Sequence, residues 1–545
     1  MTEDENSFDT PHEINTAIRE SLKQTRSLKI TDMAGMNSIA VGLNEVAKIT
    51  VEGTAGNYFG AFNGAATLRL LGDAGNYAGD SMSGGILRIE GTAKFGTGTY
   101  IQGGSLNVLG NCGAATGQRM YNGVITIKGN TGPLAGVGMK GGMIFVNGKC
   151  GDRAGHNMEG GVIYARKFKS MGTNAMELPL TKIDKSRLIE YLEIDELEIE
   201  EFKKVVPRDD ETSLDDDFPV VLHDTPEGYL DKIILTPSYG MYNVDDILEI
   251  DGIEMNTKLG TGLGTMKLEA PFMIYDTGFT SPTVLKEAVE LKIPVISTEL
   301  PAPSRFDAGE DDDDDDDSPS GNRVVRILPE REGITVDSLN RGRGVELVIG
   351  TGAGFFVGGD LISSMPERQL DINTKDDIRH FIELIREVTH GMKAVFVTVS
   401  GENIYDLVMA LTRGKPDAII IKSQIPTSAL TVAREALDDA DRRDRIKLYV
   451  LGDLKDSEDI YKLLAMGADG IALVFQDTGA KVETAKEAFS LHRMVEEFRV
   501  LMAYSGNHTL ADIKADDLRA VNYSTAAVTG IKLVGYDQKL PIWRR

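Results

Sequence analysis

The chain has 545 residues, and its 58 lysines and arginines against 84 aspartates and glutamates leave a net charge of −26. Its 41% hydrophobic and 26% charged residues are typical of folded globular domains and exclude a fibrous or wholly disordered protein. The negative charge would repel a phosphate backbone, so we expect no nucleic-acid partner. No apolar run reaches the roughly 18 residues of a membrane span and the first residues show no signal sequence, so we expect no membrane partner and a cytoplasmic location.

Glycine is concentrated near the amino terminus, where 29 of the 59 glycines lie between residues 53 and 161. One series repeats with a spacing of 19 residues, at Gly53, Gly72, Gly91, Gly110, Gly129 and Gly148. Two more series, which begin at Gly60 and Gly85, keep the same period. A collagen helix is excluded because glycine does not recur at every third residue.

An alternating apolar pair precedes each leading glycine, as Ile49 and Val51 precede Gly53. Side chains alternate across a strand, so each pair predicts one buried face of a short strand, and the glycines predict tight corners. Neither part can bury its apolar face alone, whereas stacked turns of 19 residues would bury it. The period therefore predicts a parallel β-helix over residues 47–170, preceded by an N-terminal cap at 1–46.

The two cysteines, Cys112 and Cys150, occupy the same place in turns that are two apart. Neighbouring strands are about 4.8 Å apart, so these residues should stand roughly 9 to 10 Å apart, beyond the reach of a disulfide bond. Two cysteines are also too few for an all-cysteine iron–sulfur cluster, and no two histidines have a metal-binding spacing. We therefore expect no iron–sulfur cluster and no metal site.

The run from Gly53 to Phe62, followed one repeat later by Gly72 to Gly79, resembles the GXGXG domain of glutamate synthase. It is also similar to a related component of formylmethanofuran dehydrogenase. In both families this domain is a right-handed β-helix that packs other domains together and carries no chemistry. The resemblance implies a right-handed parallel β-helix here, and protein partners or a homo-oligomer formed through it.

The pattern changes after residue 170. Residues 171–217 form a helical and acidic connector, and from 218 to 545 short apolar runs alternate with amphipathic helices. This alternation predicts a parallel α/β domain, for which a TIM-like barrel is favoured over an open doubly wound sheet. Seven consecutive aspartates predict a solvated acidic loop at 307–322. The seven candidate strands are 272–275, 295–297, 347–349, 394–399, 418–421, 448–451 and 470–474.

This second half resembles the FMN-binding barrel of glutamate synthase. The resemblance rests on four motifs, at 270–274, 350–353, 371–378 and 454–469. It implies FMN at the carboxyl ends of the barrel strands and places Gly350, Gly352 and Gly452 among the cofactor-binding residues. It assigns no catalytic residue.

Several departures from the family speak against flavin chemistry. Gly354 and Thr398 stand where the family has lysines, and Asp453 beside Gly452 would repel the FMN phosphate. Ala472 and Val474 replace glycines whose bare amides would approach that phosphate. The three cysteines that bind a 3Fe-4S cluster in the family are absent too.

The sequence therefore predicts a glutamate synthase-related protein of the ammonia-assimilation family with lost or altered flavin chemistry and a scaffold or regulatory role. The alternative is an active FMN-dependent oxidoreductase that reduces an imino or keto acid. The retained architecture favours the enzyme, and the altered loops favour the scaffold.

Overall fold

In a computed structural model, the chain forms two compact units. Unit 1 comprises Met1–Pro219, Glu330–Asn340 and Glu383–Gly391, and unit 2 comprises Val220–Pro329, Arg341–Ile382 and Met392–Arg545. The domain limits expected from the sequence stay a prediction. The structure describes residues 10–208, 229–235, 252–260, 264–276, 278, 280–298, 323–328, 331, 333–349, 355–357, 360–363, 375–400, 403–423, 425–452, 454, 456–474, 490–536 and 538–539.

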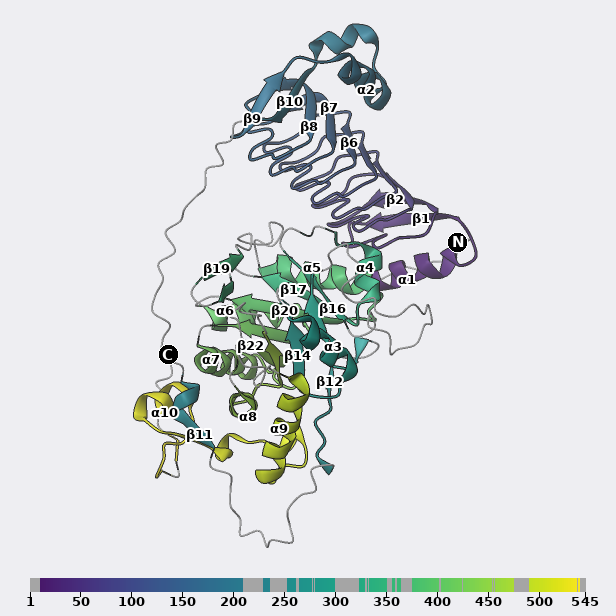
Figure 1. Cartoon of the computed structure of the whole chain (residues 1–545). Coiled ribbons are helices and arrows are strands. Elements are labelled where there is room, and N and C mark those ends of the chain that lie inside the picture. The colour runs from purple at the N-terminus through teal and green to yellow at the C-terminus, as the bar shows by residue number, and fades with distance from the viewer. Residues whose placement is uncertain are drawn as a thin grey trace. The chain divides into compact units, whose positions relative to one another are not determined.

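Unit 1 is built around a ten-stranded sheet in which β1 to β8 pair in parallel in chain order (Figure 1). Leu68 pairs with Leu87 and Leu87 with Leu106, each 19 residues further along. We call β1 to β8 with their connecting turns the rung stack. Its strands are β1 (Ser27–Ala34), β2 (Lys48–Thr54), β3 (Thr67–Leu71), β4 (Ile86–Ile89), β5 (Ser105–Val108), β6 (Val124–Ile127), β7 (Met143–Cys150) and β8 (Val162–Phe168).

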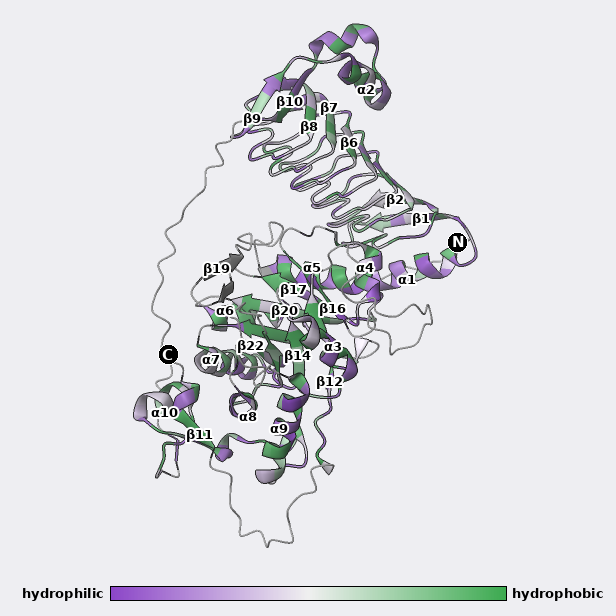
Figure 2. Ribbon diagram, viewed as in Figure 1, coloured by the Kyte–Doolittle hydropathy of each residue, from purple (hydrophilic) through white to green (hydrophobic). Residues whose placement is uncertain are grey.

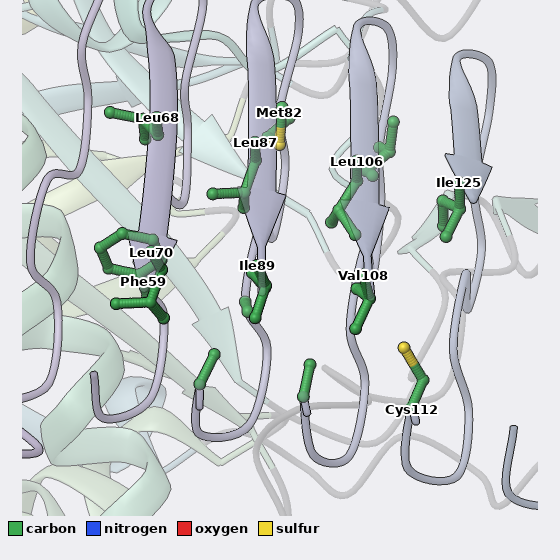
Figure 3. Close-up of a cluster of buried hydrophobic side chains, with 14 of the residues drawn as sticks. Phe59, Leu68, Leu70, Met82, Leu87, Ile89, Leu106, Val108, Cys112 and Ile125 are labelled. Carbon is green, nitrogen blue, oxygen red and sulfur yellow. The ribbon is translucent and has the colours of Figure 1, made fainter. Parts of the chain in front are cut away.

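The inner face of the rung stack is a row of aliphatic side chains. Figure 3 shows Leu68, Leu87, Leu106 and Ile125 in one row, and all four are fully buried. A fully buried leucine or isoleucine contributes roughly 1.5 to 3 kcal/mol relative to an exposed one, so the repeated row is a large part of the stability of unit 1. The predicted apolar pairs are thus confirmed as the inward positions of strands.

The glycines at the end of each rung allow close stacking. A Cβ on Gly72 would stand 1.9 Å from the carbonyl oxygen of Gly53 in the preceding rung. Gly79 instead has a φ of +69°, in the left-handed region that side chains disfavour. The 19-residue glycine period therefore follows from rung-to-rung contact and from corner geometry.

The two cysteines lie inside the rung stack. Both Cys112 and Cys150 are free, as predicted, and both are buried. Burial raises the pKa of each thiol to about 12. Neither sulfur has the exposed, thiolate character that a reactive cysteine needs.

Helices cover the first end of the rung stack and the outer face of its last strands. Helix α1 (Pro11–Leu22) begins with a capping box between Thr10 and Glu13 and buries Ile14 and Ile18 in the same core. At the other end, α2 (Lys182–Leu192) and the 3₁₀ helix η1 (Glu196–Glu201) pack on the outer faces of β7 and β8.

The connector differs from its predicted helical character at two points, strands β9 and β10. Lys203–Pro207 forms strand β10, which pairs antiparallel with β8 and with β9 (Ala175–Leu178). Val205 is buried in the core of the rung stack. The edge of β8 offers backbone partners that override the local helical pattern.

Two later segments of the chain belong to unit 1. Arg331 is fully buried, donates from Nη1 to Oδ1 of Asp80 at 2.9 Å, and stands over the ring of Tyr100. The carboxylate of Glu387 accepts a bond from the amide of Asn15 at 3.0 Å. These segments fold with the rung stack although they are flanked in sequence by barrel strands.

Unit 2 contains a closed barrel of eight parallel strands, in which β14 pairs with both β15 and β23 (Figure 1). The predicted TIM-like barrel is confirmed, and the alternative of an open sheet is excluded by this closure. The barrel strands are β14 (Phe272–Tyr275), β15 (Val295–Ser297), β16 (Arg323–Ile327), β17 (Gly344–Ile349), β20 (Ala394–Ser400), β21 (Ala418–Lys422), β22 (Lys447–Gly452) and β23 (Gly470–Leu473). All seven predicted strands are present, and β16 is an eighth that the prediction missed.

Short apolar strands and amphipathic helices alternate around the barrel, and Figure 2 shows β14, β20 and β22 in the hydrophobic colour. The helices in this part of the chain are α3 (Pro282–Glu290), α4 (Val336–Arg341), α5 (Lys375–Val388), α6 (Ile404–Leu411), α7 (Pro426–Asp439), α8 (Ser457–Ala465), α9 (Leu491–Tyr504) and α10 (Tyr523–Thr529). Most of α4 and the last part of α5 belong to unit 1. Smaller elements are the pairs β11 (Ile233–Leu235) with β24 (Leu518–Ala520), β12 (Thr257–Leu259) with β13 (Met266–Leu268), and β18 (Phe355–Val357) with β19 (Asp360–Ser363). The 3₁₀ helices are η2 (Leu230–Lys232), η8 (Leu510–Asp512) and η9 (Ala515–Asp517). None of the helices in the described ranges has the length and apolar character needed to cross a membrane.

Gly72→Ala should destabilise unit 1, because the new methyl group would collide with the Gly53 carbonyl and force the two rungs apart. We expect a loss of about 1 to 3 kcal/mol in the free energy of unfolding, measured by urea denaturation of the full chain. Gly252→Ala is the matched control, since no heavy atom lies within 4 Å of a Cβ built there. Equal stability of the two variants would contradict the rung geometry.

Candidate functional site

The barrel interior is apolar at most inward positions and becomes charged toward the carboxyl ends of its strands. We call five residues at these positions the charged cluster: Tyr275 on β14, Arg326 on β16, Glu346 on β17, Thr398 on β20 and Lys422 on β21. Below them the interior is filled by buried residues such as Met273, Phe396 and Ile420. In parallel α/β barrels, sites for ligands lie at the carboxyl ends of the strands, so this cluster is the candidate site.

A buried ion pair forms the centre of the charged cluster. Arg326 and Glu346 are directly opposite each other in the pairing of β16 with β17, and Nε of Arg326 donates to Oε2 of Glu346 at 2.7 Å. Their side chains are only 3% and 0% exposed. Two charges removed this far from water are costly unless their remaining hydrogen-bonding groups find partners.

Those partners are present. Nη1 of Arg326 donates to the carbonyl oxygen of Asp276 at 2.8 Å, and Nη2 donates to that of Ile296 at 3.2 Å. The guanidinium carbon stands 3.7 Å from the centre of the Tyr275 ring. Burial acts to lower the pKa of Arg326, but Tyr275 and Glu346 outweigh it and raise that pKa.

The other oxygen of Glu346 is held as well. The hydroxyl of Thr398 donates to Oε1 of Glu346. Burial raises the pKa of Tyr275, and the charge of Glu346 and a hydrogen bond to it raise it further, so the phenol is neutral. The carboxylate is therefore bound by three side chains from three strands.

Lys422 is the last residue of β21 and has a different environment. It follows Ile420, the partner of Thr398 in the sheet, by two positions, so it faces the interior one step closer to the carboxyl end. Burial lowers the pKa of Lys422 from 10.5 to about 8, and the positive charge of Arg326 adds to this effect while Glu346 opposes it. Its amine is thus partly neutral near physiological pH.

The three glycines predicted to bind a cofactor are placed as follows. Gly350 and Gly352 lie outside the described residues, as do Gly354, Asp453 and the acidic loop. Gly452 ends β22, and a Cβ there would meet only the side chain of Leu454, at an ordinary 3.4 Å. The fold itself does not require a glycine at this position, and the assignment of all three glycines stays a prediction.

Only part of the region that would hold the phosphate end of FMN lies within the described residues. A flavin phosphate in such a barrel is held at the ends of the last two strands by bare amides and positive charge. The described residues that end β22 and β23 include Leu454 and Val474, and no lysine or arginine is among them. Within the charged cluster, Lys422 is the partly exposed cation that would suit an anionic group. No group of three potential metal ligands converges within the described ranges.

Sequence reasoning missed the residues that make the cluster. It missed β16 because Arg323 and Arg326 interrupt its apolar run, and it started β17 after Glu346. A usable signal was present. Arg326 lies two positions after Val324, and Glu346 lies two positions after Gly344, so each is on the same strand face as a residue that points inward.

Two family models match the chain. The GXGXG motif matches residues 9–216, and the conserved region in glutamate synthase matches residues 354–477. The archaeal-type glutamate synthase [NADPH] of Thermotoga neapolitana is 25% identical over 265 residues, covering 41% of this chain and 51% of that protein. A glutamate synthase large subunit-like protein of Rhizobium meliloti is 28% identical over 186 residues, covering 28% of this chain and 42% of that protein. The chain spans about half the length of the curated relatives it matches.

Two solved structures are also similar. The formyltransferase/hydrolase complex (FhcABCD) of Methylorubrum extorquens in complex with methylofuran has a chain 28% identical to this one, with a TM-score of 0.29 and coverage of 32% of this chain and 70% of that chain. The flavin-binding domain of baker's yeast flavocytochrome b2 is 15% identical, with a TM-score of 0.38 and coverage of 54% of this chain and 77% of that chain.

The chain belongs to a class of two-part proteins. One part is a stack of 19-residue rungs with a GXGXG pattern, and the other is a closed parallel barrel that carries the conserved glutamate synthase region. The chain is a glutamate synthase-like protein.

Glu346→Leu should strongly destabilise unit 2, because it leaves the buried guanidinium of Arg326 without its counter-charge. We expect a loss of about 3 to 5 kcal/mol in the free energy of unfolding. The double variant Arg326→Met/Glu346→Leu should recover most of this loss, since it removes both charges. Urea denaturation of the three proteins checks this, and a double variant as unstable as the single one would show that the charge balance is not the cause.

Proposed function

We propose that this glutamate synthase-related protein has lost or altered flavin chemistry and acts as a scaffold or regulatory subunit in ammonia assimilation. The observation that carries the proposal is the engagement of Arg326. Its donors are directed to Glu346 and to two backbone carbonyls inside the barrel. An arginine bound in this way braces the strands and is not presented to a ligand phosphate.

The ends of β22 and β23 support the same proposal. Leu454 and Val474, at the ends of β22 and β23, are bulkier than the glycines that would let a phosphate approach backbone amides. Bulky side chains at these two strand ends favour a barrel that is retained for its shape.

For unit 1 we propose a right-handed parallel β-helix. A second set of parallel bridges, from Ala74 through Ala93 and Cys112 to Thr131, runs beside the strand ladder with the same 19-residue step. Two parallel ladders in one repeat are what a coil with one turn per rung would produce.

We further propose that copies of the chain associate through the outer face of β3 to β5. The outer faces of β7 and β8 are covered by α2, where Phe145 and Tyr164 are fully buried. Ile86 on β4, by contrast, is 44% exposed, and Arg88, two positions further along the same strand, pairs with Arg69 of β3. An exposed isoleucine bordered by charges has the character of an interface with a polar rim.

The second candidate is an active FMN-dependent oxidoreductase that reduces an imino or keto acid. Lys422 favours it, because a partly exposed cation at the carboxyl end of a barrel strand suits an anionic ligand. In that case FMN would be the redox cofactor.

Titration with FMN separates these two candidates. We expect the purified full chain to lack flavin absorption and to quench no FMN fluorescence, with Lys422→Met and Lys393→Met behaving alike. Lys393 is a matched control, because burial also lowers its pKa but it precedes β20 at the amino end of the barrel. Stoichiometric FMN binding that Lys422→Met weakens about tenfold or more and Lys393→Met does not would establish the oxidoreductase instead.

Light scattering of the full chain tests the proposed self-association. Ile86→Asp should lower the molar mass of the particle, because a charge replaces the apolar centre of the interface. Val46→Asp is the control, since Val46 is 78% exposed but precedes β2 outside this face. A mass unchanged by Ile86→Asp, or a monomer from the start, would overturn this interface.

A further inference from the structure

We propose that the rung stack binds an acidic segment of a partner protein, rich in aspartate or glutamate, where β7 and β8 end. Four exposed residues there form what we call the basic corner: Lys149, Arg153, Lys167 and Lys169. The inference goes beyond the proposed scaffold role and does not depend on it, because it concerns a surface away from β3 to β5 and is tested by itself.

The charge of this part of the chain is opposite to that of the whole. Residues 91–170 contain nine lysines and arginines against two acidic residues, a net charge of +7, whereas the whole chain carries −26. One of the two acids, Asp152, borders the basic corner. Its carboxylate already accepts a bond from Nζ of Lys169 at 2.6 Å and one from the hydroxyl of Ser170 at 3.2 Å. The corner therefore keeps an excess of positive charge.

Two of the cations face each other. Lys149 and Lys167 are directly opposite in the pairing of β7 with β8, two strands that lie side by side (Figure 1). Neighbouring strands are about 4.8 Å apart, and like charges opposite each other destabilise a sheet. Among the residues that the structure describes, neither lysine has an acidic partner in an ion pair. Their repulsion thus costs stability in the unbound protein.

The fold has a neutral residue for this position. The equivalents of Lys149 in the two preceding rungs are Asn111 and Asn130. Oδ1 of Asn111 accepts a bond from the backbone N–H of Asn130, and Oδ1 of Asn130 accepts one from that of Lys149, each at 2.8 Å. A further asparagine would extend this ladder without repulsion. Stacking of the rungs does not require lysine here, which favours a role in binding.

The size of the basic corner indicates the class of partner. Its four cations come from two adjacent rungs, about 4.8 Å apart, so the patch is narrow. A nucleic acid or an anionic membrane carries negative charge well beyond such a patch and would meet the rest of a strongly acidic chain. A short run of aspartates or glutamates brings its carboxylates to the corner alone. A carboxylate between Lys149 and Lys167 would also offset their repulsion.

Binding of an aspartate peptide tests the proposal. Fluorescein-labelled heptaaspartate is titrated with the full chain at about 0.05 M salt, and its fluorescence anisotropy is measured. A second titration uses the full chain with Asp311–Asp317 replaced by asparagines, so that the chain's own aspartates do not compete. We expect saturable binding by at least one of these proteins, weakened about tenfold or more at about 0.5 M salt, because salt screens exposed charges.

Two variants of the corner separate binding from folding. Lys149→Glu/Lys167→Glu reverses both charges and should weaken peptide binding about tenfold or more. Lys149→Asn/Lys167→Asn should weaken binding as well, yet unfold at the same or a higher urea concentration, because it removes the repulsion. The matched control is Arg26→Glu/Lys48→Glu, which reverses two exposed charges at the first rungs and should bind like the parent protein.

The outcomes that contradict the proposal are distinct. Absence of saturable binding by both proteins at low salt would overturn it, as would equal binding by the parent protein and the two corner variants. Tighter binding of duplex DNA or of phosphatidylserine vesicles than of heptaaspartate, lost in the same variants, would overturn the assignment to an acidic protein segment.

Discussion

Parallel backbone pairing at a fixed 19-residue step is the constraint on which unit 1 depends. From β2 to β7 each rung hydrogen-bonds to the next over the strand, and bridges in the following turn keep the same step, so a residue meets its equivalent 19 positions further along. The consequences follow directly. Leucines stack on leucines, and glycine is needed where a carbonyl of the neighbouring rung comes within 1.9 Å of the place of a Cβ. Backbone contact between rungs thus accounts for the composition of the first third of the chain.

Parallel pairing also organises unit 2, with a different outcome. Closure of eight strands forces alternate side chains into one interior, and near the carboxyl ends these include Arg326, Glu346 and Lys422. The first two neutralise each other with the help of Thr398, Tyr275 and two backbone carbonyls. Because the hydrogen-bonding groups of Arg326 and Glu346 have these partners, the ion pair stiffens the barrel. Burial and the charge of Arg326 keep the pKa of Lys422 low. The same small region thus contains a structural ion pair and a lysine with a lowered pKa.

The two units also differ in how they relate to sequence order. Unit 1 recruits Glu330–Asn340 and Glu383–Gly391, and it buries Arg331 against Asp80. A buried arginine bound to a carboxylate gives such a recruited segment a specific position, because the charge is stable only where its partner is. Segments with no repeat pattern of their own can therefore fold with the rung stack.

How much could be predicted from the sequence varied with the range of the interactions. The strand of each rung and seven barrel strands were predictable, because alternation and glycine period are local patterns. Strand β10 was not, because the edge of β8 decides it, and β16 was not, because its arginines look like surface residues until a partner is known. Gly350 and Gly352 came from resemblance alone and lie outside the described residues, so they remain predictions.

The sequence by itself determined the 19-residue repeat, the α/β character of the second half and the resemblance to glutamate synthase. Each of these follows from the spacing of residues along the chain or from a contiguous motif. The tertiary structure alone decided that the barrel closes, that Arg326 is matched by Glu346, and that Lys422 faces the same interior. The physical reason is that burial and charge pairing depend on residues that come from separate strands. A local sequence pattern does not determine which strands will be neighbours.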